Sequence, residues 1–209
     1  MTDQRHPIDT VVFDAMGVLY RSADDVAELL VPYATGKGSP LDAPRIGELY
    51  TECSLGRFDT DELWRRLGVS GASDEEYCAL HELTEGTLPL LERLTDRGVG
   101  LACLSNDVSE WSVLLRRRFA LDKLIPTWVI SGDIGARKPA PESFGALLAT
   151  LDVTDARRVL FVDDRKANVE AARAAGLTAA HFGTGSTSDD LREVRDMNSL
   201  QEVLDTWIS

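Results

Sequence analysis

The sequence predicts an α/β fold of three layers, in which a parallel sheet lies between two layers of helices. Five short apolar runs are nearly continuous in valine, leucine, isoleucine and phenylalanine, which is typical of strands covered on both faces. Helical patterns alternate with these runs through most of the chain, as parallel strands require. Residues 22–86 interrupt the alternation with several helical patterns and no clear strand, so we expect them to form a small helical module.

The predicted core elements follow one another closely along the chain. The strands are TVVF (10–13), VGLACL (99–104), TWVI (127–130), RVLFV (158–162) and LTAAHF (177–182). The helices are 88–97, 108–119, 141–151 and 168–175. Pro141 suits a first helical turn, and Gly98 and Gly176 are typical of helix ends. We expect the tail to contain a turn-rich loop, GTGSTSDD (183–190), and a short helix that ends near Trp207.

The helical module is predicted to contain four helices. They are DDVAELLVPY (24–33), APRIGELYTE (43–52), TDELWRRLG (60–68) and DEEYCALHELT (74–84). Asp59 and Ser73 stand where an N-cap residue would accept a backbone hydrogen bond. Trp64 and Tyr77 lie at helical spacing, and we expect them to pack inside the module.

The composition restricts the class of partner. The 209 residues suffice for a medium domain with an inserted module. The net charge of −13 repels nucleic-acid phosphates and anionic lipids, so we expect neither nucleic acid nor a membrane as a partner. Three cysteines without a C-x-x-C pair favour a reducing compartment. With no apolar signal segment and no run of span length, a cytoplasmic location is predicted, and the oligomeric state is unknown.

Polar side chains follow four of the predicted strands, at the point where each strand ends. They are Asp14, then Ser105 and Asn106, then Lys138 in the loop after TWVI, and then Asp163 and Asp164. In an open parallel sheet, ligands bind beyond the carboxyl ends of the strands. We therefore expect three carboxylates, a hydroxyl, an amide and an ammonium group at one edge of the sheet.

This set of groups has a chemical logic. A carboxylate can act as a nucleophile and form a covalent intermediate. Several neighbouring carboxylates favour a divalent cation, and magnesium suits a site made of oxygen ligands. A serine hydroxyl and backbone N–H groups can hold phosphoryl oxygens, and a lysine can stabilise negative charge in the transition state.

On these residues the chain resembles the haloacid dehalogenase-like (HAD) hydrolases, in the form that carries a helical cap after the first motif. FDAMGV, LSN, RKPAPESF and FVDD match the four motifs of that family in order, over nearly the whole chain. The resemblance implies a Rossmann-like core made of residues 1–21 and 87–209. It also implies that residues 22–86 are the inserted cap.

The resemblance further implies a role for each motif residue. Asp14 would be the nucleophile, and Ser105, Asn106 and Lys138 would bind the transferring phosphoryl group. Asp14, Asp163, Asp164 and the backbone carbonyl of Met16 would hold Mg²⁺. The implied activity is hydrolysis of a small phosphorylated metabolite through an aspartyl phosphate on Asp14.

Each motif also has a structural interpretation. Asp14 and Gly17 could simply open a turn, and Lys138 could be a surface lysine. Ser105 and Asn106 could cap the helix that begins near residue 108. Asp163 and Asp164 could cap the helix that begins near Lys166.

Met16 departs from the phosphatases of the family, which have a second aspartate there. A thioether neither donates nor accepts a proton, and general acid–base help is worth about 10²–10⁴-fold in rate. A weak or specialised phosphatase is the first interpretation, and a non-catalytic, regulatory binding protein is the second. The third is a 2-haloacid dehalogenase, whose F-D-A-Y-G-T motif is close to FDAMGV. The paired acids of FVDD oppose it, and Arg21 is a candidate halide ligand by position only.

A substitute acid or base could come from the cap. His81, Glu48 and Glu52 have suitable chemistry, although we expect His81 on the cap surface. Trp111 could line the mouth of the pocket, but packing in the core is the favoured interpretation.

Overall fold

A parallel sheet of six strands forms the centre of the molecule in the computed structural model, which describes residues 7–183 and 192–208. The strand order is β3–β2–β1–β4–β5–β6, and every neighbouring pair is parallel. The strands are β1 (Thr10–Phe13), β2 (Gly100–Ser105), β3 (Thr127–Ile130), β4 (Val159–Asp163), β5 (Thr178–Phe182) and β6 (Arg192–Val194). The predicted fold class is confirmed.

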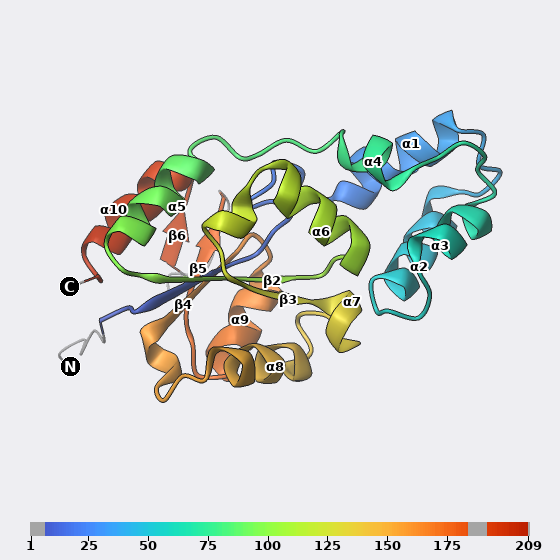
Figure 1. Ribbon diagram of the computed structural model, residues 1–209. Coiled ribbons are helices and arrows are strands. Elements are labelled where there is room, and N and C mark those ends of the chain that lie inside the picture. The colour runs from blue at the N-terminus through green and yellow to red at the C-terminus, as the bar shows by residue number, and fades with distance from the viewer. Residues whose placement is uncertain (1–6, 184–191, 209) are drawn as a thin grey trace.

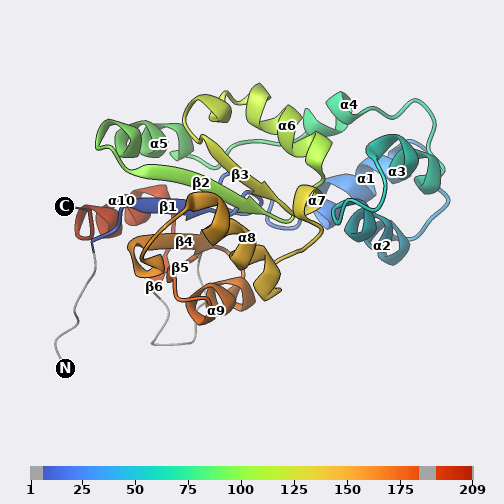
Figure 2. The same ribbon diagram turned by 60° about the horizontal axis from the view of Figure 1, so that its bottom comes forward.

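Helices cover both faces of the sheet. One layer contains α5 (Thr87–Asp96), α6 (Ser109–Arg118) and α10 (Met197–Asp205), and the other contains α8 (Pro141–Leu151) and α9 (Lys166–Ala174) (Figures 1 and 2). The alternation of side chains along β1 explains the two layers, because Val11 and Phe13 join one apolar cluster and Val12 joins the other. Both faces are therefore buried, as the continuous apolar runs indicate.

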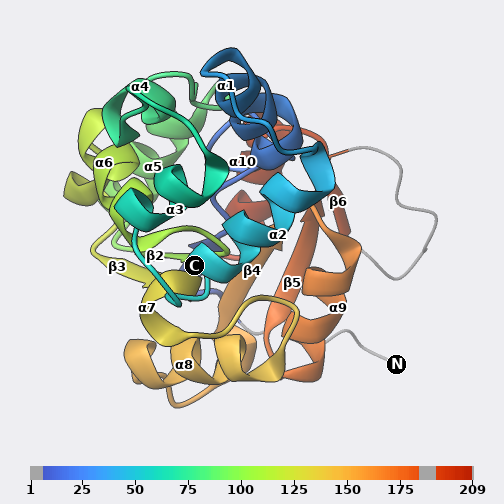
Figure 3. The same cartoon turned by 90° about the vertical axis from the view of Figure 1, so that its right-hand side faces the viewer.

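The segment between β1 and α5 lies beyond the carboxyl end of the sheet and is helical (Figures 1 and 3). It comprises a π-helical turn at Val26–Leu30, then α1 (Val31–Gly36), α2 (Ala43–Cys53), α3 (Thr60–Leu67) and α4 (Asp74–Cys78). Asp59 and Ser73 cap α3 and α4 as predicted, by accepting hydrogen bonds from the N–H groups of Glu62 and Glu76.

Several predicted boundaries are wrong. The helix predicted over 74–84 ends at Cys78, because the chain turns back there and Leu83 forms an antiparallel bridge with Tyr20. The pattern over 24–33 forms the π-helical turn and the first residues of α1. The short strand β6 and the short helix α7 (Ser131–Ile134) have no counterpart in the sequence prediction. The loop predicted over 183–190 lies almost wholly outside the described residues.

Buried aromatic side chains join the helical module to the core. The indole N–H groups of Trp64 in α3 and Trp111 in α6 both donate to the Asp74 carboxylate, at 2.7 and 2.8 Å. Tyr77 packs against both indoles, with ring centroids 6.0 Å from Trp64 and 4.3 Å from Trp111. Trp64, Tyr77 and Trp111 are thus packing residues, as expected.

The location predicted for His81 is wrong. Its side chain is buried rather than exposed, between Tyr20 and Tyr77. Burial lowers the pKa of this imidazole to about 4.

Within the described residues, no helix has the length and apolar character that crossing a bilayer requires.

Candidate functional site

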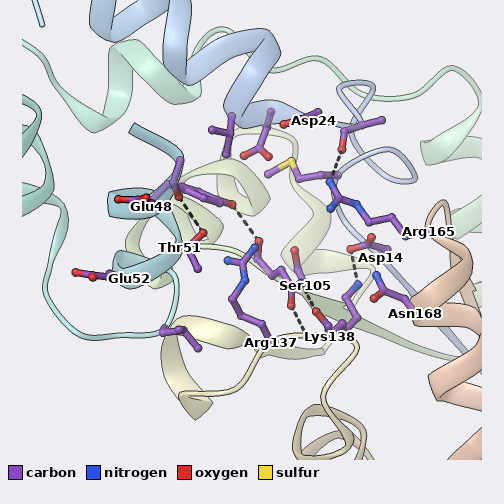
Figure 4. Close-up of a pocket in the computed structure, with 18 of the residues that line it drawn as sticks. Asp14, Asp24, Glu48, Thr51, Glu52, Ser105, Arg137, Lys138, Arg165 and Asn168 are labelled. Carbon is purple, nitrogen blue, oxygen red and sulfur yellow. Dashed lines mark hydrogen bonds and ion pairs between the residues drawn. The ribbon is translucent and has the colours of Figure 1, made fainter. Parts of the chain in front are cut away.

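A pocket of about 670 Å³ opens at the carboxyl end of the sheet, where the core meets the helical module (Figure 4). The core wall consists of Asp14, Met16, Ser105, Asn106, Arg137, Lys138, Arg165 and Asn168. The opposite wall consists of Ala23, Asp24, Asp25, Val26, Gly47, Glu48, Tyr50, Thr51, Glu52, Leu55 and Arg57. All seven residues that the sequence nominates for the site come together here, because Asp163 and Asp164 lie against Asp14 beneath the core wall.

Asp14 is held at the tip of β1. Its backbone N–H donates to the carbonyl of Val162 in the neighbouring strand β4, at 2.8 Å. Its Oδ1 accepts from the N–H of Ala15 and from Nζ of Lys138, both at 2.7 Å. These contacts fix the carboxylate through Oδ1.

Lys138 is a buried ammonium group rather than a surface lysine. Its Nζ contacts Oδ1 of Asp14 at 2.7 Å, Oδ2 of Asp163 at 2.8 Å and the carbonyl oxygen of Leu104 at 2.7 Å. Three acceptors satisfy the three N–H donors of an ammonium group. Burial lowers its pKa and the two carboxylates raise it, and the net direction is upward. Lys138 therefore stays charged between two acids.

Asn106 positions the loop that carries this lysine. Its side-chain oxygen accepts from the backbone N–H of Lys138 at 2.7 Å, and its Nδ2 donates to the carbonyl of Lys138 at 2.9 Å. The tip of β2 and the loop after β3 are thereby tied together at the chemical site. Asn106 does not cap α6, because this helix has no side-chain cap, and the N–H of its N-cap residue Val108 donates to Asp107 at 2.7 Å.

Ser105 is a buried hydroxyl with an unfilled hydrogen-bonding role. The residue is 2% exposed, and its Oγ has no partner in residues 7–183 and 192–208. It does not cap α6 either, since that helix has no side-chain cap. A buried hydroxyl that lacks a partner loses the energy of a hydrogen bond unless a ligand supplies one.

Asp163 and Asp164 have different surroundings. Asp163 is fully buried, and its oxygens accept from Nζ of Lys138, from Nδ2 of Asn168 and from the backbone N–H of Arg165. The bond from the Arg165 N–H is the part of the predicted capping role that the structure shows. Among the described residues, Arg165 is the N-cap residue of α9, and its side chain makes no capping hydrogen bond. Oδ1 of Asp164 is buried and has no partner among the described residues.

The three acids form a cluster that suits a divalent cation. One carboxylate oxygen from each of Asp14, Asp163 and Asp164 lies within 4.8 Å of the others. Burial and then the charge of Asp163 raise the pKa of Asp14, and the same two causes raise the pKa of Asp164 to about 6. A cation would relieve this repulsion and bind the partnerless Asp164 oxygen, and hard oxygen ligands are those that Mg²⁺ prefers. The residues present therefore fit Mg²⁺.

Gly17 allows the first loop to approach Asp164 closely. Its φ of +79° favours glycine, and a Cβ atom at this position would lie 2.4 Å from Oδ2 of Asp164. Met16, one residue earlier, lines the pocket and is 7% exposed. The loop thus brings a thioether, with no acid or base, to the side of Asp14.

The candidates for a substitute acid or base divide into two groups. Glu48 and Glu52 line the pocket, but they also contact Arg45 at 2.7 Å and Arg66 at 3.6 Å. His81 does not line it.

Arg21 points away from the pocket. It forms an exposed ion pair with Glu82 at 2.8 Å and does not line the cavity. This position does not support its role as a halide ligand.

Sequence reasoning missed five charged residues that line the two walls of the pocket. They are Asp24, Asp25, Arg57, Arg137 and Arg165. In the sequence, Arg137 directly precedes Lys138, and Arg165 directly follows Asp164. This adjacency to motif residues was the available signal. Asp25 had no comparable signal in the sequence.

Comparison with known proteins identifies a family and a relative that each cover most of the chain. The family model described as haloacid dehalogenase-like hydrolase matches residues 8–176. Phosphatase MT3486 of Mycobacterium tuberculosis (strain CDC 1551 / Oshkosh) is 32% identical, over 95% of this chain and 97% of the relative.

Solved structures share the fold at lower identity. A HAD phosphatase from Thermococcus onnurineus has a TM-score of 0.74 at 21% identity, covering 94% of this chain and 98% of its own. An L-2-haloacid dehalogenase from Xanthobacter autotrophicus has a TM-score of 0.68 at 18% identity, covering 95% and 98%. Proteins named for two different reactions share this fold, so the fold alone does not choose between them.

Proposed function

The chain belongs to the haloacid dehalogenase-like hydrolases, and we propose that it is a magnesium-dependent phosphatase of small phosphorylated metabolites. The observation that carries the proposal is the buried array of Asp14, Lys138, Asp163 and Asp164. It combines a carboxylate nucleophile, a fixed ammonium group and a pair of acids that fits Mg²⁺. The name of the 32% identical relative, a phosphatase, supports the same activity.

In this mechanism Oδ2 of Asp14 attacks phosphorus, and the bond between phosphorus and the substrate's ester oxygen breaks. The phosphoryl group is then carried as an aspartyl phosphate on Asp14. Ser105 donates its unpartnered hydroxyl to a phosphoryl oxygen, and Lys138 stabilises the negative charge that develops. A water molecule next attacks phosphorus, which releases inorganic phosphate and restores the carboxylate.

Mg²⁺ would be held by the carboxylates of Asp14, Asp163 and Asp164 and the backbone carbonyl of Met16, and it would neutralise phosphoryl charge. Asn168 and Lys138 keep Asp163 oriented toward this position. We assign residues 22–86 as the cap that closes the pocket, since they supply its second wall.

Met16 sets the expected substrate preference. It cannot protonate a departing alkoxide, so the ester oxygen has to leave with its own electron pair and take a proton from water. Esters with acidic leaving groups, such as acyl and aryl phosphates, are therefore favoured over alkyl phosphates.

Met16 also favours a second candidate, a binding protein that holds a phosphorylated ligand without turning it over. Its distinguishing property is retention of ligand without release of phosphate. The dehalogenase interpretation is weaker, because two further carboxylates beside Asp14 would repel a carboxylate-bearing substrate.

The test is phosphate release by the purified protein with and without Mg²⁺, using acetyl phosphate, an aryl phosphate and several sugar phosphates. We expect magnesium-dependent release that falls by about 10⁴-fold or more in Asp14→Asn, since the nucleophile is removed. Asp133→Asn is the matched control, because it changes the same residue type outside the pocket lining. Release that persists in Asp14→Asn contradicts the mechanism, and no release by the wild-type protein on any substrate favours the binding protein.

A further inference from the structure

Asp25 is a buried carboxyl group in the cap wall of the pocket. It directly precedes the π-helical turn at Val26–Leu30 and lines the same cavity as Asp14 and Met16. The residue is 6% exposed, and its Oδ2 has no hydrogen-bond partner in the part of the chain that the structure describes. Unpartnered buried carboxyl oxygens are rare in folded proteins, because desolvation of the group is then not repaid by a hydrogen bond.

The other acids of the cap wall have partners within the protein. Glu48 contacts Arg45 at 2.7 Å, and Glu52 contacts Arg66 at 3.6 Å. Asp24 accepts from the backbone N–H of Ala27 at 3.0 Å. Asp25 therefore differs from its neighbours in having an oxygen for which the fold itself supplies no donor.

The charges around Asp25 come from the cap and from the core. Asp24 raises its pKa, and Arg137 and Arg165 across the pocket lower it, but burial is the largest cause and raises it to about 6. The charge of Asp25 in turn helps to raise the pKa of Asp107 and the pKa values of the Tyr50 and Tyr77 phenols, for which burial is the largest cause.

Arg137 is held in place by other groups. It donates to Oγ of Ser54 and lies 5.5 Å from the ring centroid of Tyr50. Its guanidinium group thus offsets part of the charge of Asp25 while being anchored elsewhere. Oδ2 therefore remains available to accept a hydrogen bond from a donor that a ligand brings into the pocket.

We propose that Asp25 is a substrate-recognition residue, which accepts a hydrogen bond from a hydroxyl or ammonium group on the organic part of the phosphate ester. This inference rests on the proposed function, because it places the phosphoryl group at Asp14 and the organic group against the cap wall. Because Met16 favours acidic leaving groups, the substrate class is an aryl or acyl phosphate whose organic part carries a hydroxyl or ammonium group, rather than one with an apolar organic part. A site built to hydrogen-bond a substrate group discriminates strongly against an analogue that lacks the group.

The experiment compares three aryl phosphates of similar size and similar leaving group: 4-(2-hydroxyethyl)phenyl phosphate, 4-(2-aminoethyl)phenyl phosphate and 4-propylphenyl phosphate. For each ester, kcat/KM is measured with the wild-type protein, Asp25→Leu and Asp25→Asn. Asp24→Asn is the matched control, since it removes the neighbouring charge but not the unpartnered oxygen. Ratios between esters cancel the differences between variants in general activity.

We expect the wild-type protein to prefer one or both polar esters over 4-propylphenyl phosphate by about tenfold or more. Asp25→Leu removes this preference, whereas Asp24→Asn preserves it. Asp25→Asn, which keeps the shape and an acceptor oxygen, retains a preference for the hydroxyl ester and loses that for the ammonium ester. A preference that is the same in wild type, Asp25→Leu and Asp25→Asn overturns the proposal.

The same comparison is made without turnover. Binding of the three esters to Asp14→Asn and to Asp14→Asn with Asp25→Leu is measured by calorimetry in the presence of Mg²⁺. If the wild-type protein hydrolyses no ester but binding still shows the loss of preference, the phosphatase function fails and the role of Asp25 stands. If phosphate is released but neither assay shows a preference that depends on Asp25, the role of Asp25 fails and the function stands.

Discussion

The two walls of the pocket are built differently. In the core wall, Lys138 satisfies Asp14, Asp163 and a backbone carbonyl at once, and Asn168 holds Asp163 from the other side. In the cap wall, Glu48 and Glu52 are held by partners outside the pocket, and Asp25 keeps a partnerless oxygen. Under the proposed function, the core wall is arranged for the reaction before substrate arrives, whereas the cap wall leaves a hydrogen bond for the substrate to complete.

The largest effect is expected in the core wall, from Lys138→Met. The substitution leaves Asp14 and Asp163 facing each other without the ammonium group, so kcat should fall by about 10³-fold and the free energy of unfolding by about 3 kcal/mol. Steady-state kinetics and urea unfolding measure both. The exposed lysine offers the control, since Lys123→Met should change neither quantity. A small effect of Lys138→Met would mean that the core wall is not preorganised as described.

The next largest effect on activity is expected from Met16→Asp, in the loop that follows β1 in the core wall. It restores a group that can protonate a leaving alcohol, so hydrolysis of alkyl phosphates should rise by about 10²-fold. Acetyl phosphate, whose leaving group needs no proton, should show little gain. Met16→Asn is the matched control, with similar size and no acid. An equal gain with both substitutions would assign the defect to shape or polarity rather than to proton transfer.

Asp74→Ala tests the attachment of the cap wall to the core. Two indole N–H groups and the hydroxyl of Thr60 lose their acceptor, so the free energy of unfolding should fall by about 2 kcal/mol. Looser attachment should also raise KM more than it lowers kcat. Thermal unfolding and kinetics measure these effects, with Glu75→Ala on the same helix as an exposed control. A fall in kcat with KM unchanged would contradict the view that this contact serves substrate enclosure.

The last prediction concerns the pH dependence of stability, which is measured without substrate. Burial is the largest cause that raises the pKa of Asp107 to about 8, with Asp25 and Glu110 adding to the rise and Arg137 opposing it. Between about pH 4 and 8, the folded protein therefore holds a proton on Asp107 that the unfolded chain has already released. The free energy of unfolding falls as pH rises through this range.

Asp107→Asn should make that fall shallower by up to about 1.4 kcal/mol per pH unit, because the buried group no longer titrates. Urea unfolding between pH 5 and 8 measures the slope, and Asp122→Asn is the exposed control. Identical slopes for wild type and Asp107→Asn would place the charge of Asp107 in a more solvated setting than its burial indicates.

The core wall of the pocket could be predicted from the sequence to a larger extent than the cap wall. The strands and the core residues of the site could be predicted, because buried parallel strands are continuous apolar runs and their carboxyl ends meet at one edge. Asp25 could not be predicted, since its burial arises from contact between segments far apart in the chain. His81 was misjudged for the same reason, as Tyr20, which buries it, is distant in sequence.

Gly17 has a consequence for how such an enzyme can change. The loop after β1 carries Met16, which faces the cavity, and Gly17, where a Cβ atom would meet Oδ2 of Asp164 at 2.4 Å and Cα of Ala23 at 3.2 Å. Adjacent positions thus differ in their surroundings: the side chain at position 16 lines the cavity, whereas a Cβ atom at position 17 would overlap Asp164. Diversification of reaction type on this scaffold is therefore open at position 16 and closed at position 17, which makes residue 16 the site to randomise when a new activity is sought.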